Sequence, residues 1–172
     1  FDIWMNVLGK FEDVYLALCI SNKNIKENLK IYCDKKKFNF NKIIFLDPID
    51  HYENLKRIST FDLYLDTFPY NGHTGISDSL FQSCVPTISF TGKSFASRVS
   101  YSLLNSANLQ KLLTYNEKDY AEMIEYYCTN RKDLKNIRDH LIEFKKSNLN
   151  RMIKFTRDFE KILTSVHLDY QN

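Results

Sequence analysis

The chain has 172 residues, of which 44% are hydrophobic and 26% charged, so it is long enough to bury a substantial core and is not typical of a disordered chain. Its formal net charge of +3 is too small to imply a nucleic-acid partner by itself. Residues 131–161 carry ten Lys or Arg and five Asp or Glu, which favours a solvated helical face over a patch for polyanions or membranes.

The four cysteines are widely spaced and form no CxxC pair. Two of them lie inside apolar runs, where they resemble small core residues. The sequence shows no signal peptide and no apolar run of about 18 residues, so we expect the reducing cytoplasm and no membrane span. The chain begins at Phe1 inside a helix-like pattern, which suggests a domain cut from a longer protein.

The first two thirds of the chain alternate between predicted helices and predicted strands. A helix near the amino terminus ends at Gly9, a plausible cap, and continuous apolar runs of strand length follow it. The predicted strands cover residues 14–20, 42–46, 63–66, 85–90 and 109–114, and the helices between them cover 24–37, 50–59, 74–83 and 95–105. This alternation predicts an α/β fold with a parallel sheet and helices on both faces.

The pattern changes after residue 116. Three amphipathic helices are predicted over residues 117–128, 131–145 and 149–166, with no strand between them. Asn116 is the expected cap of the first of these helices, with Asp119 at the capping-box position. The chain is therefore expected to end in a helical segment.

Three loops should meet at the carboxyl edge of the sheet, where α/β folds bind ligands. They cover residues 47–51, 66–74 and 91–95. The middle loop leads past Gly72 to Gly75, and these are two of the chain's four glycines. A strand, a tight glycine turn and a helix start together form an anion site, because unpaired N–H groups point outward. An ordinary turn capped by Thr74 is the alternative.

Three segments resemble a known family. DTFPYNGHTGISDSL (66–80), VPTISFTGKSFASRVSYSLL (85–104) and LTYNEKDY (113–120) resemble the C-terminal half of the catalytic region of the O-GlcNAc transferase family. That family includes bacterial relatives and the cytoplasmic bacterial N-glucosyltransferases of adhesins. The resemblance runs from the helix at Trp4 to about Leu141.

The resemblance implies the C-terminal half of a GT-B glycosyltransferase, with a Rossmann-like nucleotide-sugar-binding domain over residues 1–146. Residues 147–172 would form a C-terminal helix that packs on or near this domain. The family binds a UDP-sugar as co-substrate and needs no metal or other cofactor. The missing N-terminal half of the same enzyme would supply the acceptor site and the catalytic groups, so this segment alone is expected to bind donor without turnover.

The resemblance also implies the residues that hold the diphosphate and the ribose. His73, Thr74 and Gly75 would lie against the diphosphate, and Asp78 would bind a ribose hydroxyl. Asp78 lies one helical turn after Thr74, so the two are expected to face the same way. Gly75 replaces a phosphate-contacting threonine of the family, and its backbone N–H is expected to serve instead.

The nucleoside would lie over the first loop. The backbone around Ile49 would meet the uracil edge, with Arg57 nearby. His51 matches a position where O-GlcNAc transferases often carry a ribose-binding lysine, and Asn54 matches a histidine that stacks on the base. Because Asn54 cannot stack as a ring does, His51 or Tyr52 takes over this role or the affinity for the base falls. The donor, UDP-GlcNAc or UDP-glucose, therefore stays open.

The expected function is transfer of GlcNAc or glucose from a UDP-sugar to Ser, Thr or Asn side chains of a protein or peptide acceptor. No catalytic residue is assigned within the chain. A GT-B transferase with a glycan or small-molecule acceptor and a non-catalytic nucleotide-sugar-binding module are the alternatives. A Rossmann domain for another cofactor is disfavoured, because the sequence lacks GxGxxG.

Overall fold

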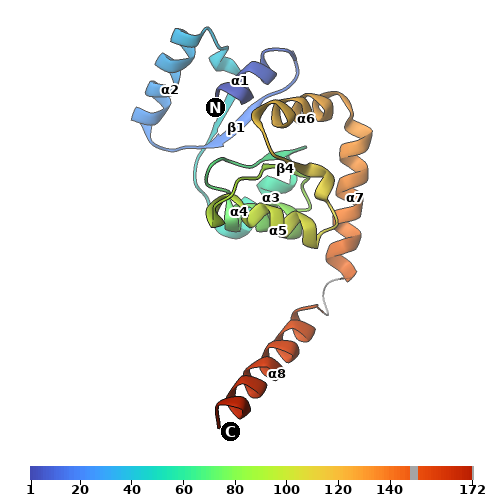
Figure 1. Ribbon diagram of the computed structural model, residues 1–172. Coiled ribbons are helices and arrows are strands. Elements are labelled where there is room, and N and C mark those ends of the chain that lie inside the picture. Colours follow the sequence, from blue (N-terminus) through green and yellow to red (C-terminus); the bar gives the residue numbers. More distant parts are fainter. Residues whose placement is uncertain (148–150, 172) are drawn as a thin grey trace.

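The computed structural model describes residues 1–147 and 151–171, which form an α/β body and a separate last helix (Figure 1). The helices are α1 (Asp2–Leu8), α2 (Lys23–Lys36), α3 (His51–Ser59), α4 (His73–Ser77), α5 (Val99–Ser106), α6 (Glu117–Thr129), α7 (Arg131–Ser147) and α8 (Arg151–Gln171). The strands are β1 (Leu16–Cys19), β2 (Ile43–Leu46), β3 (Tyr64–Leu65), β4 (Thr87–Phe90) and β5 (Leu113–Thr114). The predicted α/β fold is confirmed.

Local sequence signals explain where several helices begin and end. The Asn22 side chain accepts the backbone N–H of Asn24 at 2.9 Å at the start of α2, and Lys37 ends that helix in the left-handed conformation with φ 60°. The predicted cap of α6 is also present, because the Asn116 side chain accepts the N–H of Asp119 at 2.8 Å. These contacts satisfy backbone groups that the helix ends leave unpaired.

The strands are parallel, as predicted, but they form two hydrogen-bonded sets in the described part of the chain. β1 pairs with β2, and β3, β4 and β5 form the second set in that order. The expected single sheet is interrupted between the two sets: β3 has only two residues, and its ladder bonds run to β4. Leu65 packs against both hydrophobic clusters, so the two sets still share a continuous interior.

The smaller cluster is built on the first strand pair. Met5, Leu8, Leu16, Cys33 and Ile43 are buried together between α1, α2 and the two strands. The expectation that residues 14–20 form a strand buried on both faces is wrong at both ends: β1 covers only Leu16–Cys19, and Tyr15 before it is 55% exposed. Leu16 is buried, but Cys19 is exposed, because β1 ends there at the open edge of the sheet.

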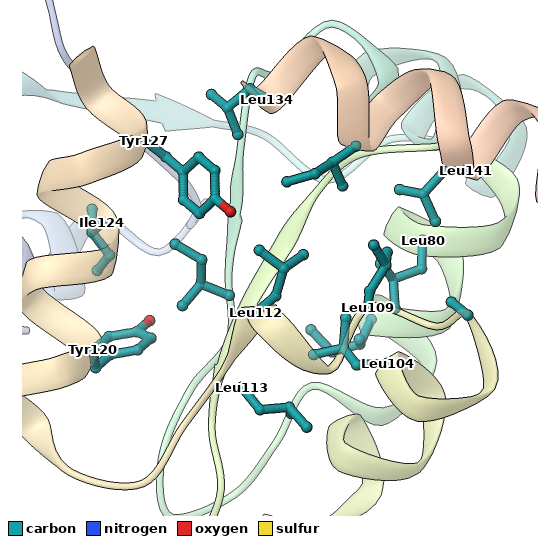
Figure 2. Packing of buried hydrophobic residues seen from close by; sticks show 14 of the residues in the cluster. Leu80, Leu104, Leu109, Leu112, Leu113, Tyr120, Ile124, Tyr127, Leu134 and Leu141 are labelled. Carbon is teal, nitrogen blue, oxygen red and sulfur yellow. The ribbon is translucent and has the colours of Figure 1, made fainter. Parts of the chain in front are cut away.

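The main core lies on both sides of β4 and β5 (Figure 2). Tyr120, Ile124 and Tyr127 of α6 lie on one side of the strands, while Leu80 and Leu104 lie on the other. Leu80 and Leu104 are fully buried. Burying one such side chain contributes about 1.5–3 kcal/mol, so this layer supplies much of the driving force for folding.

A relay of two hydrogen bonds, both made by the Tyr120 hydroxyl, connects elements within the same core. The Tyr120 hydroxyl donates to the Asp66 carbonyl at 2.8 Å and accepts the Trp4 indole N–H at 3.1 Å. Burial raises the pKa of Tyr120 well above its usual range, so the phenol stays protonated. The relay joins α1 and α6 to the carboxyl end of β3, where the middle rim loop begins.

Helix α7 runs along one side of the body and holds two loop segments in place (Figure 1). The Arg138 guanidinium donates to the carbonyl of Ser59, the last residue of α3, at 2.9 Å, and to that of Phe61 in the connection to β3. The Lys145 ammonium donates to the Gln82 carbonyl at 2.7 Å. These bonds fix the ends of two elements that bear the candidate site.

The last helix, α8, stands apart from the body (Figure 1). Its described side chains, from residue 153 to residue 171, are all exposed. The expected packing of residues 147–172 on or near the domain therefore stays a prediction. Residues 149–150, the start of the third predicted amphipathic helix, lie outside the described residues. Among the described helices, none is both long and apolar enough to cross a membrane.

Tyr120→Phe removes both bonds of the relay and leaves the Asp66 carbonyl and the Trp4 N–H without their buried partner. We expect the free energy of unfolding to fall by about 1–3 kcal/mol, measured by urea denaturation. Tyr115→Phe is the matched control, because the Tyr115 side chain is 63% exposed. Equal midpoints for the two variants would contradict the relay's role.

Candidate functional site

The carboxyl ends of β2, β3 and β4 lead into the three predicted loops. We call residues 47–51 the first rim loop, 66–74 the middle rim loop and 91–97 the third rim loop, which extends the predicted segment 91–95 to the end of a 3-10 turn. The backbone N–H of Asn71 donates to the Ala96 carbonyl at 2.8 Å, so the middle and third loops lie side by side. Within the third loop, the Gly92 N–H donates to the Ser97 carbonyl at 3.0 Å. The predicted arrangement of neighbouring loops is present.

The middle rim loop is shaped by the buried carboxylate of Asp66, whose side chain is only 2% exposed. One oxygen accepts the backbone N–H groups of Thr67, at 2.9 Å, and Gly72, at 2.8 Å. The other accepts the Ser89 hydroxyl of β4 at 2.6 Å. The carboxylate thereby closes the turn over its own strand. The signal in the sequence is an acid at the end of an apolar strand, directly before the glycine turn.

Asn71 connects the middle loop to the elements that follow it. Its side chain is fully buried and donates to the Thr67 carbonyl at 3.1 Å and the Phe90 carbonyl at 3.5 Å. Its amide oxygen accepts the Ser100 N–H of α5 at 3.4 Å. A buried amide with this many partners fixes the turn in one conformation.

His73 is held from three sides. Its ring stacks on Tyr70 with ring centres 4.6 Å apart, and the ring of Phe95 approaches it edge-on at 6.0 Å. Its Nε2 lies 3.3 Å from the Ala96 carbonyl, to which a ring protonated at Nε2 donates. The residue has φ +32°, a conformation that non-glycine residues rarely adopt. Such strain is typical of functional sites, where the surrounding contacts enforce it.

The turn leaves particular backbone donors available. Among the described residues, none accepts the backbone N–H of His73 or Thr74. The Gly75 N–H is different, because it donates to the Gly72 carbonyl at 2.6 Å. The expectation that this N–H replaces a threonine side chain is therefore corrected: it is used within the turn. The available donors are those of His73 and Thr74.

Asp78 connects the helical segment after the middle rim loop to the first rim loop. A carboxylate oxygen of Asp78 lies 3.8 Å from Nδ1 of His51, which begins α3. The Asp78 side chain is 17% exposed and that of His51 is 66% exposed, so the pair lies at the surface of the rim. Asp78 also begins the π-helical turn η2 (Asp78–Gln82) that continues α4.

Arg57 holds the first rim loop in place through hydrogen bonds. Its guanidinium donates to the Asp47 carbonyl and to the Asn54 side-chain oxygen, both at 2.7 Å. One of its nitrogens also lies 3.8 Å from the Cys19 sulfur at the end of β1. Ile49, in the loop itself, is 47% exposed. Arg57 thus has a clear structural role in fixing the loop and orienting Asn54.

The predicted site residues form two neighbouring groups. Those on the middle loop and helix are His73, Thr74, Gly75 and Asp78, and those around the first loop are Ile49, His51, Asn54 and Arg57. The contact between His51 and Asp78 joins the groups. Their ligand roles stay predictions. Sequence patterns missed Asp66 and Asn71, because each also bonds to residues 19 to 29 positions away: Ser89, Phe90 and Ser100.

The chemistry of this rim favours an anionic ligand with a neighbouring diol. Free backbone N–H groups at the start of a helical segment bind phosphate oxygens, and a nearby carboxylate accepts hydroxyl groups. The described residues contain no cluster of three or more His, Cys, Asp or Glu side chains that could hold a metal ion. Metal independence remains a prediction.

The fold and the rim together define a Rossmann-like α/β domain with a candidate anion site at the carboxyl ends of its strands. The model of glycosyl transferase family 41 matches residues 1–159. The chain therefore belongs to this family, and the predicted resemblance to O-GlcNAc transferases is confirmed.

Two curated relatives show how much of a longer protein the match covers. The chain is 35% identical over 121 residues to the probable UDP-N-acetylglucosamine–peptide N-acetylglucosaminyltransferase SPINDLY of Solanum lycopersicum, which covers 70% of this chain and 13% of that protein. It is 24% identical over 172 residues to the UDP-N-acetylglucosamine–peptide N-acetylglucosaminyltransferase of Caenorhabditis elegans, which covers 99% of this chain and 15% of that protein. The chain spans a small part of each relative's length.

A solved structure has the same fold. A mutant of the O-GlcNAc transferase of Thermobaculum terrenum superposes with a TM-score of 0.87 at 23% identity, covering 94% of this chain and 32% of that one. The predicted fold class, the C-terminal half of a GT-B enzyme, agrees with this match.

Asp66→Asn tests the carboxylate that closes the middle loop. An amide offers one oxygen where the carboxylate offers two, so at least one buried donor loses its partner. We expect the free energy of unfolding to fall by about 1–3 kcal/mol in urea denaturation. Asp62→Asn is the control, because Asp62 is exposed just before β3. The account of the loop is wrong if Asp66→Asn is as stable as this control.

Proposed function

We propose that this chain is the donor-binding half of a metal-independent glycosyltransferase that transfers a sugar from UDP-GlcNAc or UDP-glucose to protein side chains. One observation carries the proposal: the backbone N–H groups of His73 and Thr74 are free at a rigid turn, with Asp78 on the same helical segment. The family membership supports a glycosyltransferase, and the two curated relatives are named as enzymes that use UDP-GlcNAc and a peptide.

The proposed role of the middle loop follows from the chemistry of transfer. When the bond between the sugar and UDP breaks, negative charge grows on the β-phosphate. Fixed N–H donors stabilise this charge without reorganising, and such electrostatic stabilisation is usually the largest single contribution to catalysis. The N–H groups of His73 and Thr74 would do this, with the helical segment behind them adding a favourable dipole. Gly75 contributes the turn and close backbone approach.

The proposed nucleoside site lies over the first rim loop. Asp78 would accept a ribose hydroxyl, with His51 beside it at 3.8 Å. The backbone around Ile49 would meet the uracil edge. Asn54, whose side-chain oxygen is held by Arg57, would lie next to the base without stacking on it. His51 or Tyr52, whose side chain is 65% exposed, would supply the ring that covers the base.

The remaining parts of the proposal concern the whole protein. The acceptor would be a Ser, Thr or Asn side chain of a protein or peptide, and the catalytic groups would come from an N-terminal half of the same enzyme. We propose the cytoplasm as its location, in keeping with four free cysteines, one of which, Cys19, is exposed. A glycan or small-molecule acceptor, or nucleotide-sugar binding without transfer, are the other outcomes of the experiments below.

Asp78→Ala removes the proposed ribose partner. We expect UDP affinity, measured by calorimetry, to fall at least about tenfold, equivalent to about 1.4 kcal/mol. Asp62→Ala, which changes an exposed acid before β3, should bind UDP as the unchanged protein does. UDP-GlcNAc, UDP-glucose and NAD are compared in the same experiment. The proposal fails if UDP does not bind at about millimolar concentration or if Asp78→Ala has no effect.

Transfer is tested with the full-length protein, a peptide substrate and each UDP-sugar in the presence of EDTA. We expect the intact mass of the peptide to rise by one hexose or N-acetylhexosamine, with the same rate with and without the chelator. Fragmentation of the product identifies Ser, Thr or Asn as the modified side chain. Free-sugar products alone would rule out a protein acceptor, and a rate lost in EDTA would rule out metal independence.

A further inference from the structure

The hydroxyl of Tyr64 lies directly beneath the turn that the nucleotide is proposed to meet. Tyr64 is on β3 and Gly75 is on α4, yet a Cβ atom placed on Gly75 would lie only 3.0 Å from the Tyr64 oxygen. Real Cβ atoms rarely come this close to another atom. The phenol therefore occupies the space into which a side chain at position 75 would extend.

Gly75 itself offers no hydrogen-bond donor to a ligand. It has no side chain, and its N–H donates to the Gly72 carbonyl at 2.6 Å. The two preceding residues, His73 and Thr74, have free N–H groups. The row of donors along the turn is therefore incomplete at position 75, which is the position that the Tyr64 hydroxyl approaches.

The Tyr64 hydroxyl is available for a ligand. Among the described residues, none forms a hydrogen bond with it, and it is not one of the fully buried polar atoms that lack a partner. Burial, followed by the charges of Asp66 and Asp78, raises its pKa, so the phenol keeps its proton and acts as a donor. The Asp66 carboxylate already accepts three donors, and none of them is the Tyr64 hydroxyl.

We propose that Tyr64 is a further donor-binding residue, whose hydroxyl donates a hydrogen bond to a diphosphate oxygen of the nucleotide at the position that Gly75 leaves without a donor. This inference rests on the proposed function. A phosphate oxygen is the matching partner because it is charged and only accepts, which makes the hydrogen bond short and strong. The neighbouring ribose hydroxyls already have Asp78 as a proposed acceptor.

The proposal predicts that substitutions at positions 64 and 75 have coupled effects on UDP affinity. A methyl group at position 75 lies 3.0 Å from the Tyr64 oxygen but 4.0 Å from the ring carbon that bears it. Gly75→Ala therefore pushes the phenol oxygen away when Tyr64 is present. In a Tyr64→Phe background the oxygen is gone, and the methyl group makes an ordinary contact with the ring.

The first test measures UDP and uridine affinity by calorimetry in the full-length protein. Tyr64→Phe is expected to weaken UDP about tenfold and to leave uridine, which lacks the phosphates, unchanged. Tyr15→Phe, an exposed phenol at the other end of the strands, is expected to change neither affinity. Thermal unfolding of each variant confirms that the proteins compared are folded.

The second test is a double-mutant cycle for UDP affinity. Gly75→Ala alone is expected to weaken UDP to a similar extent as Tyr64→Phe, and the double variant to be no weaker than Tyr64→Phe alone. Independent, multiplying effects of the two changes would overturn the proposed coupling.

The outcomes separate this inference from the proposed function. If the unchanged protein does not bind UDP at about millimolar concentration, the proposed function fails and the inference fails with it. If the unchanged protein binds UDP and Tyr64→Phe binds it equally well, the inference alone is overturned. An equal loss of UDP and uridine affinity in Tyr64→Phe would also overturn it, because the contact would then be with the nucleoside.

Discussion

The carboxylate of Asp66 is the constraint on which the candidate site depends. Its two oxygens accept the N–H groups of Thr67 and Gly72 and the Ser89 hydroxyl, so the chain must turn back over the end of β3. Because the Gly72 N–H is used in this way, the first free donors of the following helical segment are those of His73 and Thr74. The carboxylate thus determines which backbone N–H groups remain free to bind a ligand.

The hydrophobic core is connected to the site through the backbone carbonyl of Asp66. The Tyr120 hydroxyl of α6 donates to the Asp66 carbonyl, and the Trp4 indole donates to Tyr120 in turn. Fully buried Asn71 adds a second connection, because it binds the end of β4 and the start of α5. A rigid turn of this kind pays little conformational cost on binding, which favours both affinity and charge stabilisation.

Local patterns predicted most of the elements and the position of the rim. Apolar runs located the strands, and the clustered Gly72 and Gly75 located the turn, because both signals lie within a few residues. The division of the strands into two sets was not predictable, since it depends on which strands pair across the sheet and not on any local pattern. The use of the Gly75 N–H and the bond from Asp66 to Ser89, 23 residues away, depend on tertiary structure, which no local pattern encodes.

A crystal structure of the full-length protein with UDP tests the central claim most directly. The account predicts a phosphate oxygen within hydrogen-bonding distance, about 2.7–3.2 Å, of the backbone nitrogens of His73 and Thr74, and the ribose beside Asp78. A UDP molecule bound elsewhere, or bound here with its phosphates directed away from these two nitrogens, would contradict it.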